Sequence, residues 1–273
     1  MATKKLAVIT GAGSGIGLAL VHEAQKNGYR VIGLDNRKEG LSLLSEKFPT
    51  ESVLGVLADV SDIHSFRKGV MEAIEKAGTA PHLWFNNAGI ADSKPFLDTS
   101  PESYSRVIDV NLKGTMHGTH LAIEAMKESP KGTIVNISSL AGLLHSPLLA
   151  SYCASKFGVV GFTRAVQEEL RQAHHSIDLK LVLPGFIRTP LIEKDIEKDF
   201  PKWLIPLIET PESAAKEVWA AANSNQSEII ITRTGRWMHR MNKVLFGKMS
   251  HLSRIAAAKS WKELVGLDPI SWD

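Results

Sequence analysis

The sequence has little cysteine, little net charge and no long apolar run. Its single cysteine, Cys153, excludes an internal disulfide and is typical of a reducing compartment. The formal net charge of +3 is too small to indicate a nucleic-acid-binding protein. No apolar run approaches the roughly 20 residues that a bilayer-spanning helix needs, and the short basic start leads into a strand-like segment rather than a signal peptide. These absences predict a soluble cytoplasmic protein with no nucleic-acid partner.

Apolar strand-like runs alternate with helical patterns along the chain. The strand-like runs lie at residues 5–10, 29–35, 52–60, 82–89, 132–139, 178–185 and 227–232, and helical patterns lie at 15–28, 61–78, 103–129 and 152–173. Strands that are apolar throughout and separated by helices indicate a parallel sheet covered on both faces. The sequence therefore predicts a single α/β domain, a doubly wound Rossmann-like sheet over residues 1–232, with a basic extension at 233–273.

Residues 191–211 read as a lid, because apolar residues, charges and prolines mix there after a strand end. A helix then begins, with Thr210 as its expected N-cap and Pro211 at its first position.

The stretch TGAGSGIG, Thr10 to Gly17, follows a strand and opens a helix. Glycines permit a tight turn and close backbone approach, and the helix N-terminus offers free N–H groups to a pyrophosphate. A tight turn with no ligand is the alternative, but the strand–turn–helix context is the one that the nucleotide-binding motif requires.

Three residues separate the first two glycines, Gly11 and Gly15, and the segment SYCASKFG places Tyr152 and Lys156 four residues apart. Four residues make about one helical turn, so these two side chains share a helix face. NNAG (86–89), NLKG (111–114), VNISS (135–139) and LPGFIRTP (183–190) follow in order, with Ser139 lying 13 residues before Tyr152. Together these motifs resemble the short-chain dehydrogenase/reductase family in its compact form, over about residues 6–217.

The resemblance implies a nicotinamide cofactor and the residues that hold it. NNAG borders the cofactor and steadies the sheet, Asp59 and Val60 contact the adenine, and LPGFIRTP lies beside the nicotinamide. The implied cofactor-binding residues are Gly11, Gly13, Ser14, Gly15, Ile16, Gly17, Asp35, Asp59, Val60, Asn87, Ala88, Gly89, Tyr152, Lys156, Pro184, Gly185, Ile187 and Thr189.

Asp35 ends the second strand, where an acid accepts hydrogen bonds from the adenosine ribose and repels a 2′-phosphate. Together with the neutral Ser14 it favours NAD over NADP. Arg37 and Lys38 follow closely, so NADP stays possible. A solvated turn residue is the alternative interpretation of Asp35.

The chemistry of the expected reaction fits the same residues. Hydride transfer to a ketone builds negative charge on oxygen, so a proton donor is needed there, and Tyr152 is expected to be that acid/base. Lys156 and the positively charged nicotinamide would together lower the pKa of the phenol, and Lys156 would also hold the nicotinamide ribose. Ser139 would hold the substrate oxygen, and the resemblance implies that Asn111 completes a proton path through a backbone carbonyl and a water. The predicted catalytic residues are therefore Asn111, Ser139, Tyr152 and Lys156.

Ser139, His145, Tyr152 and Phe186 are the predicted substrate contacts, although a loop histidine such as His145 can equally be solvated. Apolar residues dominate the expected pocket: Leu143, Leu144, Leu148, Leu149, Leu191, Ile192, Phe200, Trp203, Leu204 and Ile205. They favour an apolar secondary alcohol or ketone, such as a lipid, steroid-like or aromatic compound, or else pack the lid onto the body. No metal site is expected, since His174 and His175 lack ligand partners at a suitable spacing. Cys153 has no base motif beside it and reads as a small helix residue rather than a nucleophile.

The extension reads as an amphipathic helix. Trp237, Met241 and Val244 are expected on one face, and Arg236, Arg240 and Lys243 on the opposite one. Such a helix docks on an anionic membrane surface or a partner, or packs on its own subunit or dimer mate. A homodimer or homotetramer is expected. A nucleotide sensor without turnover and a membrane-surface binding protein remain as rival functions.

Overall fold

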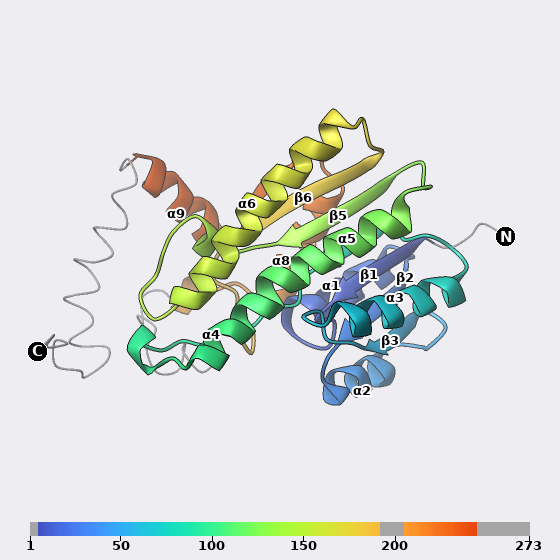
Figure 1. Ribbon diagram of the computed structural model, residues 1–273, viewed down its shortest axis with the longest axis horizontal. Coiled ribbons are helices and arrows are strands. Elements are labelled where there is room, and N and C mark those ends of the chain that lie inside the picture. The colour runs from blue at the N-terminus through green and yellow to red at the C-terminus, as the bar shows by residue number, and fades with distance from the viewer. Residues whose placement is uncertain (1–4, 192–204, 245–273) are drawn as a thin grey trace, which may run out of the picture.

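The computed structural model describes residues 5–191 and 205–244, and these form one parallel sheet with helices on both faces (Figure 1). The strands are β1 (Leu6–Thr10), β2 (Arg30–Asp35), β3 (Val53–Leu57), β4 (Leu83–Asn86), β5 (Gly132–Ile137), β6 (Ile177–Pro184) and β7 (Glu228–Ile231). They lie in the order β3-β2-β1-β4-β5-β6-β7, and every pairing is parallel. The predicted doubly wound Rossmann-like sheet is confirmed, and the chain reverses its direction of winding between β1 and β4.

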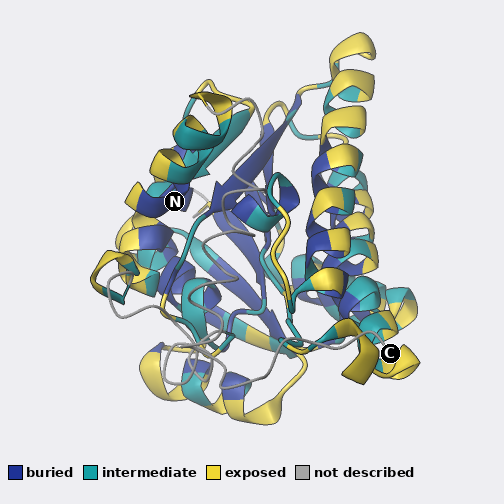
Figure 2. Cartoon of the chain, turned by 90° about the vertical axis from the view of Figure 1, so that its left-hand side faces the viewer, coloured by how far each residue is buried: buried dark blue, intermediate teal, exposed yellow. Residues whose placement is uncertain are grey.

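The helices divide between the two faces of the sheet. The longer helices are α1 (Gly15–Lys26), α2 (Lys38–Lys47), α3 (Ile63–Ala77), α4 (Pro101–Ile108), α5 (Gly114–Met126), α6 (Ala150–Gln172), α8 (Pro211–Ala222) and α9 (Arg233–Val244). Residues of α1, α2 and α8 share one apolar core with the sheet, and residues of α3, α5 and α6 pack into the core on the other face. Figure 2 shows the buried strands between two layers whose outer surfaces are exposed.

The local signals explain most of these boundaries. α1 ends before Gly28, whose φ of +78° suits glycine, and Thr210 caps α8 by accepting a hydrogen bond from the Ser213 N–H. Asp62 caps α3 in the same way. Short 3₁₀ turns lie at η1 (Phe96–Asp98), η3 (Leu140–Gly142) and η4 (Ile205–Leu207).

Two helical segments differ from the sequence prediction. The sequence pattern predicts no helix at α2, because the apolar positions there are few and the segment is rich in charge and serine. The continuous helix expected at 103–129 is instead α4, a π-helical turn η2 (Asp109–Lys113) and α5. A π-helical turn has an i to i+5 pattern that hydrophobic periodicity does not reveal.

Most of the predicted lid, 192–204, lies outside the described residues, as does the extension beyond Val244. The last part of the predicted lid segment is described, and there Glu209 forms a parallel β-bridge with Ile187 of the loop that follows β6. Across residues 5–191 and 205–244, no helix is long and apolar enough to cross a membrane.

Candidate active site

The glycine turn between β1 and α1 is shaped by close backbone contacts. Gly11 and Gly15 have φ values of +64° and +52°, which glycine adopts without strain. A Cβ on Gly17 would lie 1.9 Å from the Gly11 carbonyl oxygen, so no side chain fits there. The Ser14 side chain does not cap α1, which leaves the first N–H groups of the helix available to an anion. The turn therefore has the form of a pyrophosphate cradle.

Asp35 is buried directly behind this turn, which excludes the solvated alternative. Its carboxylate accepts hydrogen bonds from the Gly13 N–H at 2.9 Å and from the Arg37 N–H at 3.0 Å. The Arg37 guanidinium also donates to Asp35 at 3.2 Å and to the Ser14 hydroxyl at 3.0 Å. Arg37 thus connects Asp35 to the glycine turn. These residues lie where the protein would distinguish the plain adenosine ribose of NAD from the 2′-phosphorylated ribose of NADP.

The NNAG segment is joined to the glycine turn by Thr10. The Thr10 hydroxyl accepts hydrogen bonds from the N–H groups of Asn87 and Ala88, both at 3.0 Å, and the Asn87 side chain donates to the Thr10 carbonyl at 2.8 Å. Gly89 lies close to two of the predicted catalytic side chains, because a Cβ there would lie 3.4 Å from the Asn111 side-chain oxygen and 3.7 Å from the Lys156 ammonium nitrogen.

Asp59 and Val60 lie just after the carboxyl end of β3. Arg106 and Ser61 donate hydrogen bonds to the Asp59 carboxylate at 2.7 Å each. Partial burial raises the pKa of Asp59, but these hydrogen bonds outweigh it, so the pKa is lowered overall. Val60 is buried, and its carbonyl contacts the His117 ring. The segment after β3 that carries Asp59 and Val60 is therefore held in place by contacts with Ser61, Arg106 and His117.

Ser139, Tyr152 and Lys156 converge at the carboxyl end of β5. Ser139 is the N-cap of η3, and its hydroxyl accepts a hydrogen bond from the Ala141 N–H at 3.1 Å. The same side chain lies close enough to the Tyr152 phenol to lower the pKa of that phenol, against the effect of burial. Lys156 lies one turn further along α6, with its ammonium nitrogen 5.6 Å from the centre of the Tyr152 ring. That ammonium donates to the Ile137 carbonyl at 3.1 Å and is almost wholly buried.

The titration behaviour differs from the sequence prediction for Tyr152. Burial raises the pKa of Tyr152 to about 12, although the neighbouring Ser139 side chain acts in the opposite direction. Burial lowers the pKa of Lys156 to about 8. The expected depression of the tyrosine pKa by Lys156 is therefore not present in the protein alone, because loss of water disfavours both charged forms.

Asn111 lies in the π-helical turn and is fully buried. Its side chain accepts a hydrogen bond from the Ile90 N–H and donates to the Ile90 carbonyl and to the Ser155 hydroxyl at 3.0 Å. Ser155 in turn donates to the Tyr152 carbonyl at 2.7 Å. Both N–H donors of the Asn111 side chain are thus used to position neighbouring segments, and its backbone carbonyl accepts a hydrogen bond from the Thr115 hydroxyl at 2.7 Å.

The loop after β6 closes the site from the other side. Pro184 ends the strand, and Thr189 reaches the glycine turn, since a Cβ on Gly15 would lie 3.2 Å from the Thr189 methyl group. The Gly185 N–H donates to the Thr232 hydroxyl at 3.1 Å, and the Phe186 N–H donates to the Thr234 hydroxyl at 3.3 Å. Ile187 is buried and pairs with Glu209.

His145 is the predicted site residue for which the structure gives no site contact. It is exposed on the loop before α6 and makes no hydrogen bond to a described residue. Four of the expected apolar pocket residues, Ile192, Phe200, Trp203 and Leu204, lie outside the described residues. Within the described parts of the chain, no group of three or more His, Cys, Asp or Glu residues could hold a metal ion.

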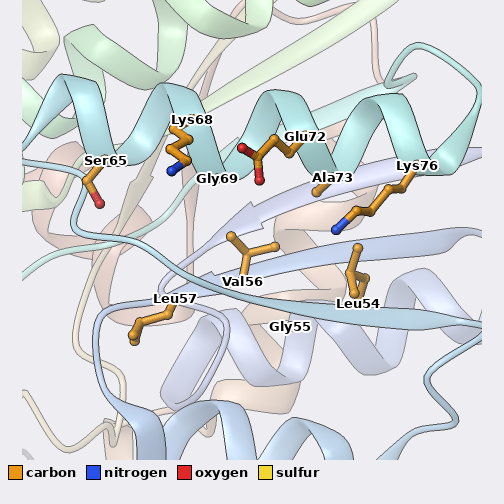
Figure 3. Close-up of a pocket in the computed structure, with 10 residues that line it drawn as sticks. All are labelled: Leu54, Gly55, Val56, Leu57, Ser65, Lys68, Gly69, Glu72, Ala73 and Lys76. Carbon is orange, nitrogen blue, oxygen red and sulfur yellow. The ribbon is translucent and has the colours of Figure 1, made fainter.

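Two hollows on the described surface differ in how close they lie to the predicted site residues. One, of about 330 Å³, touches the glycine turn and is lined in part by Gly15, Leu18 and Thr189. The other, of about 350 Å³, lies far from this chemistry, between the edge strand β3 and α3. Figure 3 shows Lys68, Glu72 and Lys76 projecting from α3 on the side that faces β3. No predicted site residue lines this second hollow.

Sequence reasoning did not find several residues that support the site. Thr232, Thr234 and Ser155 each hold a segment that carries predicted site residues. A polar residue after a strand or inside a helix gives no signal of its partner when that partner is 47 residues away.

Comparison with known proteins gives the family. The model of the short chain dehydrogenase family matches residues 5–199. The chain is 38% identical over 197 residues to the 3-oxoacyl-[acyl-carrier-protein] reductase FabG of Thermotoga maritima, covering 71% of this chain and 78% of that protein. It is 32% identical over 202 residues to the 15-hydroxyprostaglandin dehydrogenase [NAD(+)] of Rattus norvegicus, covering 71% and 72%. The solved structure of ElxO with NADP bound matches with a TM-score of 0.74 at 28% identity, over 84% of this chain and 97% of that one.

The chain therefore belongs to the short-chain dehydrogenase family, whose members are NAD(P)-dependent oxidoreductases that act on CH–OH groups of small molecules. The expected membership is confirmed. The family model ends at residue 199, so α8, β7 and α9 lie beyond its match.

Proposed function

We propose that the protein interconverts a secondary alcohol and a ketone, with Tyr152 as acid/base and with Ser139, Lys156 and Asn111 in support. The observation that carries this proposal is the convergence of Ser139, Tyr152 and Lys156 at the carboxyl end of β5, beside the glycine cradle. A sensor that never turns over substrate has no use for a phenol placed next to both a serine hydroxyl and a buried lysine.

The residues act in a simple order in the reducing direction. Ser139 donates a hydrogen bond to the substrate oxygen and fixes it next to the Tyr152 phenol. Tyr152 is protonated at neutral pH because its pKa is raised to about 12, so it can donate its proton as charge develops on that oxygen. When bound, the nicotinamide supplies or accepts the hydride.

Lys156 stabilises the resulting phenolate through its ammonium, 5.6 Å from the ring centre. The proton returns to Tyr152 by way of Lys156, a water and the Asn111 backbone carbonyl. In the oxidising direction each step runs in reverse.

The glycine cradle fits a dinucleotide, because Gly17 leaves no room for a side chain and the N-terminus of α1 is uncapped. We infer a preference for NAD, since the buried Asp35 carboxylate opposes a 2′-phosphate. Arg37 weakens this preference by placing a positive charge at the same position, so NADP is accepted less well rather than excluded. With NAD, oxidation of the alcohol is the expected direction.

The substrate that we infer is apolar, a lipid, steroid-like or aromatic alcohol. The loop between Ser139 and Tyr152 contains four partly buried leucines, which are available to contact such a substrate: Leu143, Leu144, Leu148 and Leu149. We also propose a homodimer or homotetramer, and the cytoplasmic location expected from the single cysteine stays a prediction.

The test is turnover of a panel of apolar secondary alcohols with NAD and with NADP, followed by the absorbance of the reduced nicotinamide. Tyr152→Phe removes the proposed acid/base, while Tyr29→Phe is its matched control: the Tyr29 ring packs against Trp219, far from the site. NAD-linked turnover that is lost in Tyr152→Phe and kept in Tyr29→Phe supports the proposal. Undiminished turnover in Tyr152→Phe would show that the mechanism is wrong.

A further inference from the structure

The outward face of α9 combines large apolar side chains with positive charge. Trp237 is 55% exposed and Val244 is 68% exposed. Arg233, Arg236, Arg240 and Lys243 are exposed as well, whereas Thr234 and Gly235 are buried. The expected division into opposite apolar and basic faces is therefore not what α9 shows. Trp237 and Val244 are exposed together with the basic residues, whereas the side of the helix that is buried or half-buried carries Thr234, Gly235, Met238, His239, Met241 and Asn242.

The body of the protein holds α9 in this orientation. The Thr232 hydroxyl accepts hydrogen bonds from the N–H groups of Gly185 and Gly235, at 3.1 and 3.0 Å. The Arg236 guanidinium pairs with Glu217 of α8. The exposed apolar side chains are thus presented by a fixed helix.

Positive charge dominates the sequence from here onward. Residues 233–262 contain no Asp or Glu, and they contain eight basic residues: Arg233, Arg236, Arg240, Lys243, Lys248, Arg254, Lys259 and Lys262. The whole chain has a net charge of only +3, so the rest of the protein is net negative. Arg240 and Lys243 form no ion pair with any described residue. Within α9, the charges of Arg240 and Lys243 therefore have no acidic partner among the described residues, and both side chains are exposed, as Trp237 is.

We propose that α9 docks the protein on the surface of an anionic lipid bilayer. Trp237 and Val244 enter the boundary between head groups and acyl chains, and Arg240 and Lys243 lie at the level of the lipid phosphates. Trp and basic residues on one helix side have the composition of interfacial helices. A second copy of α9 is a poorer occupant, because like charges would face one another, and a nucleic acid would leave Val244 without an apolar partner.

The position of α9 gives this docking a consequence for the site. α9 follows β7, and the end of β7 pairs with the end of β6, where Pro184 begins the loop that closes the site. Figure 1 shows α9 leaving the carboxyl end of the sheet, the end at which the first turn of α6 also lies. A docked protein therefore presents the edge that carries the candidate active site to the bilayer.

The experiment is cosedimentation of the full chain with phosphatidylcholine vesicles that contain either no anionic lipid or about one-third phosphatidylglycerol. We expect binding only to the anionic vesicles, weakened by added salt. The double variant Arg240→Glu with Lys243→Glu should lower the partition coefficient at least about tenfold, since each basic residue near such a surface contributes measurably. Lys26→Glu with Lys131→Glu makes the same change in net charge at exposed sites on the amino end of the sheet, and it should reduce binding far less.

A second measurement reports insertion itself. Vesicles with brominated acyl chains quench tryptophan that enters the bilayer, so the wild type should be quenched, whereas Trp237→Phe should bind and lose most of that quenching. Absence of binding to anionic vesicles would overturn the proposal, as would equal loss in the two double variants. Turnover of a water-soluble alcohol should be unchanged in the α9 variants, so a failure of docking is separable from a failure of the proposed enzyme activity.

Discussion

The glycine turn after β1 and the first turns of α6 contribute to the proposed site in different ways. At the turn, the groups proposed to bind the cofactor are backbone N–H groups, and the essential residues have no side chain, such as Gly17. On α6 the proposed functional groups are the side chains of Tyr152 and Lys156, both with shifted pKa values. The turn should therefore be sensitive to added volume, and α6 to the loss of a single functional group.

The largest effect is expected from Tyr152→Phe, which removes one oxygen and almost no volume. The turnover number should fall about 10²- to 10⁴-fold, the usual contribution of a positioned acid/base. Nicotinamide binding, measured by fluorescence titration, should change little. A large loss of cofactor affinity with little loss of turnover would contradict the contrast between the two regions.

Gly17→Ala is the converse change, since it adds volume and alters no functional group. The new methyl group would lie 1.9 Å from the Gly11 carbonyl oxygen, so the turn must open and cofactor affinity should fall about 100-fold. Gly161→Ala is the matched control, because nothing lies within 4 Å of its Cβ position in α6. Equal affinities in the two variants would show that the turn tolerates volume.

Lys156→Met tests the cost of burying the ammonium. The folded pKa of about 8 lies below the unfolded value of 10.5, so between these values the unfolded chain binds more protons. The free energy of unfolding of the wild type should then rise from pH 8 to pH 10, by at most about 3 kcal/mol, relative to the variant. Urea unfolding at pH 7, 8, 9 and 10 measures this, with the exposed Lys26→Met as control. A difference between wild type and Lys156→Met that is independent of pH would contradict the lowered pKa.

The smallest effect is expected from Arg37→Ala, which exposes the full charge of Asp35 to the ribose. The ratio of kcat/KM for NAD to that for NADP should rise about tenfold, because the guanidinium no longer offsets the carboxylate. Lys38→Ala is the control, since the hydrogen-bond partners of the Asp35 carboxylate within the described chain are Gly13 and Arg37 and not Lys38. An unchanged ratio would mean that Arg37 plays no part in cofactor choice.

Much of the fold could be predicted because its signals are local. All seven strands coincide with apolar runs, and the Gly28 and Thr210 helix boundaries follow from single residues. The α2 helix and the π-helical turn around Asn111 could not, since the first lacks a periodic apolar face and the second breaks the periodicity that reveals helices.

The sequence by itself determined the order of the strands along the chain, the glycine turn and the one-turn spacing of Tyr152 and Lys156. These depend on residues close together in the chain. Only the tertiary structure decided that Tyr152 stays protonated, that Arg37 turns toward Asp35, and that Thr232 holds the Gly185 loop. Loss of water and hydrogen bonds across 47 residues arise when distant segments pack together, and no local pattern encodes them. The same packing turned Trp237 outward, toward the surface that α9 is proposed to meet.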